Sequence, residues 1–133
     1  MTLHLKGCGG TTRMGPMKLT FLGTGTSFGV PVVGCDCEVC TSEDPRDKRT
    51  RHGALLEFDE GTVLVDTPPE LRLQLLAAGV ENVDVVWYTH VHADHVHGID
   101  DLRVFTAHQR RDIPAFVPEE YDDQFRTRFS YIF

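Results

Sequence analysis

Apolar residues occur in short runs separated by turn residues, a pattern that predicts strands alternating with helices. The first run, MKLTFLG, begins at Met17 and predicts a strand. Four further runs of strand length follow: GALLEFD (53–59), TVLVD (62–66), VDVVWYT (83–89) and IPAFVP (113–118). The first two of these flank the pair Glu60-Gly61 and therefore predict a β-hairpin. The run at 83–89 is rich in β-branched and aromatic residues, which favours a buried strand.

Three segments between and after these runs predict helices. The segment 68–79 has proline in its first turn, leucines that recur at 71, 75 and 76, and Gly79 at its end. DDLRVFTAHQ (100–109) and a segment from about Glu119 to Arg128 are the other two. Strands that first pair as a hairpin and then alternate with helices predict an α/β sandwich.

The length of 133 residues predicts one domain. Residues 1–16 have no sustained periodicity and are rich in glycine and threonine, so we expect a disordered leader, or a true start at Met17. Cys8 falls in that leader and is interpreted as a bystander. Residues 17–133 are then the folded portion.

Charge and hydropathy exclude several classes of function. The net charge of −7 argues against a broad nucleic-acid-binding face. No stretch approaches the ~18 continuous apolar residues of a membrane span, and the N-terminus lacks the apolar core of a signal peptide. We therefore expect a cytoplasmic protein without membrane or nucleic-acid partners.

Three cysteines lie close together in a polar loop at 35–52: Cys35, Cys37 and Cys40. In a reducing compartment, such a cluster favours metal thiolates over disulfides. Structural zinc takes four tetrahedral ligands, often three cysteines and one histidine. We predict a structural Zn²⁺ here, with a redox pair or surface thiols as the alternatives.

Two loops admit a plain and a functional interpretation. GTGTSFG (23–29) lacks the lysine of a phosphate-binding loop, so a tight turn that needs small residues is favoured over ligand binding. RDKRTRH (46–52) gathers basic residues with His52; a solvated loop is favoured over a rim that attracts phosphate.

The segment WYTHVHADHVHG (87–98) contains four of the seven histidines. In an extended chain, His90 and His92 point to one side, and a turn from Ala93 would carry Asp94 and His95 to the same pocket. Imidazole and carboxylate are ligands for transition metals, and open α/β sheets bind ligands at the C-terminal ends of their strands. We predict that these four residues bind metal, and that His97 beyond them does not.

Asp66 ends a predicted buried strand, where an unpaired carboxylate is costly. We expect it to orient a ligand histidine, with a helix cap as the alternative.

THVHADH matches the His-x-His-x-Asp-His motif of the metallo-β-lactamase-fold hydrolases, and the order of Asp66, helix, strand and motif also fits. FLGTGTSFGVPVVGCDCEVC together with HADHVHGIDDLR resembles the cyclic-phosphate phosphodiesterases of phosphonate degradation. The resemblance implies the N-terminal half of an αββα sandwich. It also implies two divalent metals (Zn²⁺ or Mn²⁺), one held by His90 and His92 and one by Asp94 and His95. Asp94 would then be catalytic, because it would orient the attacking water.

Four ligands are few for two catalytic metals, and the cysteine site is also one ligand short. In the resembling family the missing ligands come from the second half of the domain. We therefore expect a truncated hydrolase of small phosphate esters that needs its C-terminal half or a second copy, such as a homodimer. The alternatives are a non-catalytic metal-binding fragment or interaction module, and a protein similar to the quinone-cofactor biosynthesis protein of this fold.

Overall fold

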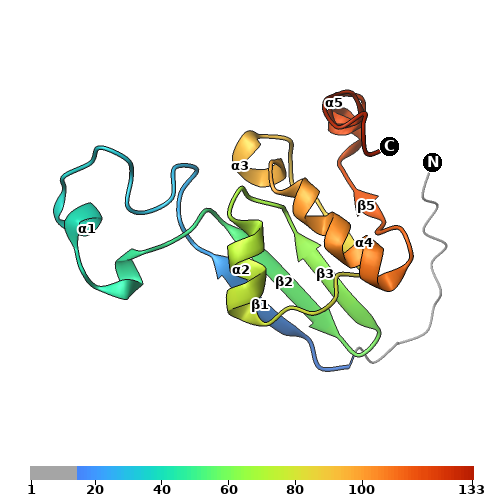
Figure 1. Ribbon diagram of the computed structural model, residues 1–133, viewed down its shortest axis with the longest axis horizontal. Coiled ribbons are helices and arrows are strands. Elements are labelled where there is room, and N and C mark those ends of the chain that lie inside the picture. The colour runs from blue at the N-terminus through green and yellow to red at the C-terminus, as the bar shows by residue number, and fades with distance from the viewer. Residues whose placement is uncertain (1–14) are drawn as a thin grey trace.

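The structure is a computed structural model that describes residues 15–133. A five-stranded mixed sheet runs through the molecule in the order β1-β2-β3-β4-β5 (Figure 1). Its strands are β1 (Lys18–Gly23), β2 (Gly53–Phe58), β3 (Gly61–Val65), β4 (Val85–Trp87) and β5 (Ala115–Phe116). β1, β2 and β3 are antiparallel neighbours, whereas β4 runs parallel to β3 and β5 parallel to β4. The expected hairpin is β2–β3, and the predicted α/β class is confirmed.

The helices alternate with the later strands, as the sequence predicts. They are α1 (Glu38–Thr41), α2 (Leu71–Ala78), α3 (Ala93–Val96), α4 (Arg103–Gln109) and α5 (Asp122–Arg128). Three 3-10 turns precede or connect them: η1 (Pro45–Asp47), η2 (Ile99–Leu102) and η3 (Glu119–Tyr121). The leader expected at 1–16 lies almost wholly outside the described residues.

Several elements are shorter than the apolar runs suggest. The run at 83–89 forms a strand only over β4, because the Thr89 amide donates to the Asp66 carboxylate (2.8 Å) and not to a neighbouring strand. The run at 113–118 pairs only at Ala115 and Phe116. The helix expected from residue 68 begins at Leu71, whose amide donates to the Pro68 carbonyl.

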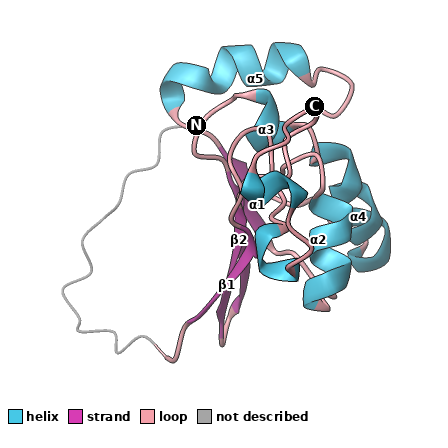
Figure 2. Cartoon of the chain, turned by 90° about the vertical axis from the view of Figure 1, so that its left-hand side faces the viewer, coloured by secondary structure: helices cyan, strands magenta, loops and turns pink. Residues whose placement is uncertain are grey.

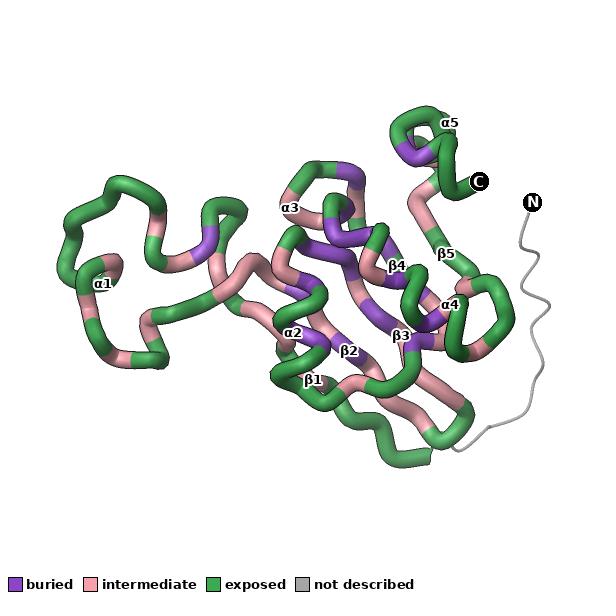
Figure 3. Tube along the Cα trace, in the orientation of Figure 1, coloured by how far each residue is buried: buried purple, intermediate pink, exposed green. Residues whose placement is uncertain are grey.

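The core lies between the sheet and the helices on one of its faces (Figures 2 and 3). Leu64 and Val86 of the sheet are fully buried there, together with Leu71 of α2. Phe125 of α5 is 1% exposed and packs against Tyr88, with 4.7 Å between ring centroids. These contacts fix the ends of β3 and β4, from which the candidate site is built.

The opposite face of the sheet is apolar at every paired position that points outward. Two rows of side chains cross it: Leu19, Leu56, Val63 and Val85 form one row, and Phe21, Ala54, Val65, Trp87 and Phe116 form the other. We call these nine residues the apolar face. In the part of the chain that the structure describes, α2, α3 and α4 lie on the other side of the sheet (Figure 2). Phe21 is 69% exposed and Trp87 56%.

None of the helices within residues 15–133 has the length and hydropathy that crossing a bilayer requires.

Candidate metal centre

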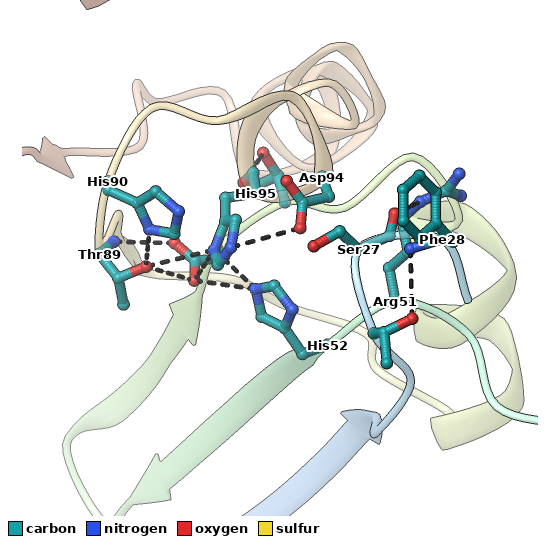
Figure 4. A network of polar contacts seen from close by, with 11 residues as sticks. Ser27, Phe28, Arg51, His52, Thr89, His90, Asp94 and His95 are labelled. Carbon is teal, nitrogen blue, oxygen red and sulfur yellow. Dashed lines mark hydrogen bonds and ion pairs between the residues drawn. The ribbon is translucent and has the colours of Figure 1, made fainter. Parts of the chain in front are cut away.

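Four chain segments meet at one edge of the sheet. β1, β3 and β4 end at this edge and β2 begins there, because β2 is antiparallel to its two neighbours while β4 is parallel to β3. The segments contribute Ser27, His52 and the histidine window that starts at His90 (Figure 4), together with Asp66 directly after β3. Residues far apart in the sequence are thus brought to one place.

Asp66 lies at the back of this cluster and is 1% exposed. Its backbone has a φ of 62°, a left-handed conformation that Asp and Asn adopt more readily than most residues. Both carboxylate oxygens accept hydrogen bonds from Thr89, one from the amide and one from the hydroxyl, each at 2.8 Å. Nδ1 of His95 lies 2.8 Å from Oδ2 of Asp66. The buried carboxylate is therefore compensated, and it faces a histidine as the orienting role requires.

α3 is held against the end of β3 by two backbone hydrogen bonds. The Thr67 amide donates to the His95 carbonyl (2.7 Å), and the Gly98 amide donates to the Thr67 carbonyl (2.8 Å). A Cβ on Gly98 would lie 2.2 Å from the Pro68 carbonyl oxygen, so only glycine permits this close approach. The short helix predicted from Ala93 thus exists, and its position is fixed by glycine just beyond its end.

The imidazoles of the window lie together. The ring centroids of His90 and His92 are 4.6 Å apart, and those of His90 and His95 are 3.6 Å apart. Nε2 of His95 is 3.6 Å from Oδ2 of Asp94. The structure therefore gathers the four residues that the sequence singles out. The sequence does not predict that the His90 ring contacts both the His92 ring and the His95 ring.

His52 is a member of the cluster that the sequence analysis missed. Its Nε2 lies 2.6 Å from Nδ1 of His95 and 3.8 Å from Oδ2 of Asp66. Potential ligand atoms of His52, Asp66 and His95 all lie within 4.8 Å of one another. Burial, followed by the neighbouring His95, lowers the pKa of His52, so its ring is neutral and able to bind metal at pH 7. The sequence does contain a signal for this role: His52 stands directly before a strand that starts at the same end of the sheet as the site.

Asp94 is prepared to carry negative charge. Its partial burial opposes ionisation, but a hydrogen bond from its own backbone amide and one from the Ser27 hydroxyl more than offset this effect, and the pKa of Asp94 is lowered. Ser27 approaches Asp94 from the loop after β1 (Figure 4). The glycine-rich loop therefore contributes a side chain to the site, in addition to forming the turn expected there.

The basic run at 46–52 is largely used within the protein. Arg46 pairs with Asp44 at 2.6 Å, and Lys48 donates to the Ser42 carbonyl. Arg51 donates to the Ser27 carbonyl and pairs with Glu70, which fastens the loop after β1 to the site edge. These pairs favour a structural role for the run over a phosphate-attracting rim.

Three other residues that could bind metal are His97, Asp100 and His108. His97 is exposed and lines a cavity beside His90. His108 lies on α4 and lines a groove between α2 and α4, and Asp100 accepts from the Tyr131 hydroxyl at 2.8 Å. Neither His108 nor Asp100 is brought to the cluster.

The three cysteines form a second group away from the histidines, with sulfur atoms within 4.8 Å of one another. The Val32 amide donates to Sγ of Cys40 at 3.3 Å. The backbone amide of Cys40, with the thiols of Cys35 and Cys40, lowers the pKa of Cys37 to about 7. A group of free thiols of which one, that of Cys37, is easily deprotonated suits a zinc ion.

The protein has a mixed α/β fold in which histidines and a carboxylate cluster at the ends of the strands. This arrangement is typical of metal-dependent proteins. The family model of the beta-lactamase superfamily domain matches residues 61–133, more than half of the chain. The chain therefore belongs to this family, and the resemblance to the metallo-β-lactamase fold is confirmed.

Three relatives bear on the chemistry. A solved diphosphatase from the PhnP family is 42% identical, with a TM-score of 0.83 over 88% of this chain and 47% of that one. Zinc-bound PqqB from Methylobacterium extorquens is 26% identical, with a TM-score of 0.57 over 64% of this chain and 36% of that one. The octanoyltransferase of Porphyromonas gingivalis is 46% identical over 118 residues, which are 88% of this chain and 24% of that protein. The chain thus spans less than half the length of each.

Proposed function

We propose that the protein to which this chain belongs is a metal-dependent hydrolase of phosphate esters. The observation that carries the proposal is the contact of the His90 imidazole with those of His92 and His95, beside the Asp94 carboxylate and in front of buried Asp66. The 42% identity to a diphosphatase supports a phosphate ester as the substrate. A cyclic phosphate ester is the narrower form of the proposal.

The donor set fits a divalent transition metal. His90, His92, Asp94 and His95 would hold metal, with Zn²⁺ or Mn²⁺ in two positions, and the structure adds His52 as a further nitrogen donor. Divalent metal supplies Lewis-acid chemistry: it acidifies water and neutralises charge on phosphoryl oxygens.

The chain's own residues prepare these donors. Nδ1 of His95 lies 2.8 Å from the Asp66 carboxylate, and a proton held between them would leave Nε2, which faces Asp94, free to bind metal. The Ser27 hydroxyl favours the ionised form of Asp94. Asp66 and Ser27 thus orient or stabilise two of the proposed ligands.

The cysteines form the second part of the proposal. Cys35, Cys37 and Cys40 would hold one structural Zn²⁺, and this ion would order the loop around α1. Free thiols are typical of a reducing compartment, which supports a cytoplasmic location.

Turnover of a cyclic phosphodiester tests the function. Residues 1–133 are assayed with added Zn²⁺ or Mn²⁺, alone and mixed with the part of the PhnP-family diphosphatase that this chain does not match. We expect little turnover by the chain alone, because it offers few ligands for two metals. A metal that is misplaced by an ångström can cost ~100-fold in rate. We expect an increase on mixing and a loss with His92→Ala. An absence of metal-dependent turnover in both arrangements would contradict the proposal.

A non-catalytic metal-binding module is the second candidate. The exposed apolar face favours it, because large open apolar surfaces mark sites of interaction. Full metal occupancy without turnover, alone or after mixing, would favour this candidate over the hydrolase.

A further inference from the structure

A cavity of about 560 Å³ opens beside the candidate metal centre. One wall is the ligand loop, with His90, His92 and His97. The other wall comes from the C-terminal segment, with Tyr121 at the end of η3 and Gln124 and Arg128 on α5. The cavity therefore lies between the proposed metal ligands and α5, a helix for which the sequence predicts no function.

The side chains that line this cavity suit an anion. Its polar lining consists of imidazoles, a phenol, an amide and a guanidinium, and it includes no carboxylate. This composition is unusual in a chain whose net charge is −7. The groove between α2 and α4, by contrast, is lined by carboxylates as well as by basic side chains: Glu81, Asp100 and Asp101 lie there together with Arg72, Arg103 and His108. The cavity beside the histidines thus differs from this groove because its lining has no carboxylate that would repel an anion.

Arg128 is held at this cavity because residues before and after it in the sequence pack in the core. Phe125 and Phe129 are 1% and 5% exposed, and their rings are in contact within the core. Nη1 of Arg128 donates to the Val91 carbonyl at 2.5 Å, and Val91 lies between His90 and His92. The guanidinium is therefore fixed at the ligand loop, and one hydrogen bond leaves most of its five N–H donors free.

We propose that Arg128, with Gln124 and Tyr121 beside it, binds the non-reacting oxygens of the phosphoryl group in the substrate. A planar guanidinium donates two parallel hydrogen bonds to phosphate oxygens, which fixes orientation as well as charge. Held on a rigid helix, it places phosphorus against the metal ligands. This inference rests on the proposed function, and it assigns α5 the role of a substrate-positioning wall.

The test uses inorganic phosphate as the probe and the full 133-residue chain loaded with Zn²⁺, with affinity measured by calorimetry. Arg128→Gln keeps an N–H donor for the Val91 carbonyl but removes the charge. We expect it to weaken phosphate binding by about 10- to 100-fold, the usual contribution of a hydrogen bond to a charged group. Arg126→Gln on the same helix is the matched control, because Arg126 is 59% exposed and pairs with Asp122. We expect at most a twofold change there.

Zinc content and melting temperature are measured on every variant, so that a lost ligand site is distinguished from a lost anion site. Equal phosphate affinity in wild type and Arg128→Gln at full zinc occupancy would overturn the inference, as would equal weakening by Arg126→Gln. Absence of zinc from the histidines in wild type would instead refute the proposed function. If Arg128→Gln does not fold, Arg128→Lys decides, since it keeps the charge but lacks the planar fork. We then expect a several-fold loss, and unchanged affinity would contradict the role.

Discussion

Asp66 shows how a single residue organises the candidate centre. It combines a left-handed backbone, nearly complete burial and three hydrogen-bonding contacts, of which two are with Thr89 and the third is with His95. Such an arrangement is costly unless every contact is made. The carboxylate thereby fixes the ring orientation of His95 and, through Thr89, the strand end that leads to His90.

Asp66→Asn tests this orienting role. Asparagine adopts positive φ as readily as aspartate and is of nearly equal size, so the fold is expected to persist. Loss of the carboxylate charge behind His95 is expected to weaken metal binding at the histidines by about 10- to 100-fold. Competition with a metal-sensitive dye measures this affinity in a background where the three cysteines are serine. Exposed Asp112→Asn serves as the control, and an affinity equal to it in Asp66→Asn would show that the carboxylate does not act on the site.

At the scale of elements, one polar link joins the start of β3 to the start of β4. The Asp84 carboxylate accepts from the Thr62 amide at 2.8 Å and from the Thr62 hydroxyl at 3.2 Å, and it pairs with Arg111. The amide of Thr62, followed by its hydroxyl and Arg111, lowers the pKa of Asp84 against the effect of burial. The parallel pairing of β3 and β4 brings the two parts of the candidate site together, so this link supports the site from a distance.

Asp84→Asn should therefore destabilise the chain by about 1–2 kcal/mol at pH 7. Because the folded-state pKa is depressed, the contribution of the ionised carboxylate is complete above the unfolded pKa of about 3.9 and is lost as the pH falls through the folded value. Urea unfolding at several pH values measures the difference between wild type and variant. The difference should be constant from pH 5 to 8 and shrink below about pH 4. A constant difference down to pH 2.5, or an equal effect of exposed Asp59→Asn, would be inconsistent with this link.

At the scale of the whole molecule, the apolar face is the main apolar surface of residues 15–133 that no other part of the described chain covers. Sheets that are buried on both faces have apolar residues at nearly every position, and this sheet has that composition. Its outward rows need a cover of similar chemistry. A second sheet would supply this cover, as in the αββα sandwich that the resemblance implies, and so would a second copy of the chain.

We expect the 133-residue chain to bind a hydrophobic dye and to associate as its concentration rises. Phe21→Lys with Trp87→Lys should reduce both the dye fluorescence and the concentration dependence of the sedimentation coefficient, because charges interrupt one row of the face. The control changes Leu73 and Leu76 on the outer side of α2 to lysine, since these are 59% and 65% exposed. Equal effects of the two pairs would show that the apolar face has no special role.

Periodicity in the sequence was sufficient to predict the class of fold and the order of its elements. It did not predict how short β4 and β5 are, because strand ends depend on tertiary hydrogen bonds such as that from Thr89 to Asp66. Metal binding by His90, His92, Asp94 and His95 follows from local spacing and stays a prediction. His52 was missed because it follows a basic run in the sequence, and only the antiparallel pairing of β2 places it beside His95. The strand sequences contain the residues of the apolar face, but apolar runs of this kind predict burial and not exposure.

Metal content is the most direct test of the central claim that the histidine window binds metal separately from the cysteines. The chain with Cys35, Cys37 and Cys40 all changed to serine is compared by elemental analysis with the same chain carrying His90→Ala and His92→Ala in addition. We predict that the first retains transition metal after dialysis and that the second loses it, with both folded by circular dichroism. Equal metal content in the two proteins would contradict the account, because the imidazoles that touch in the structure would then not be its ligands.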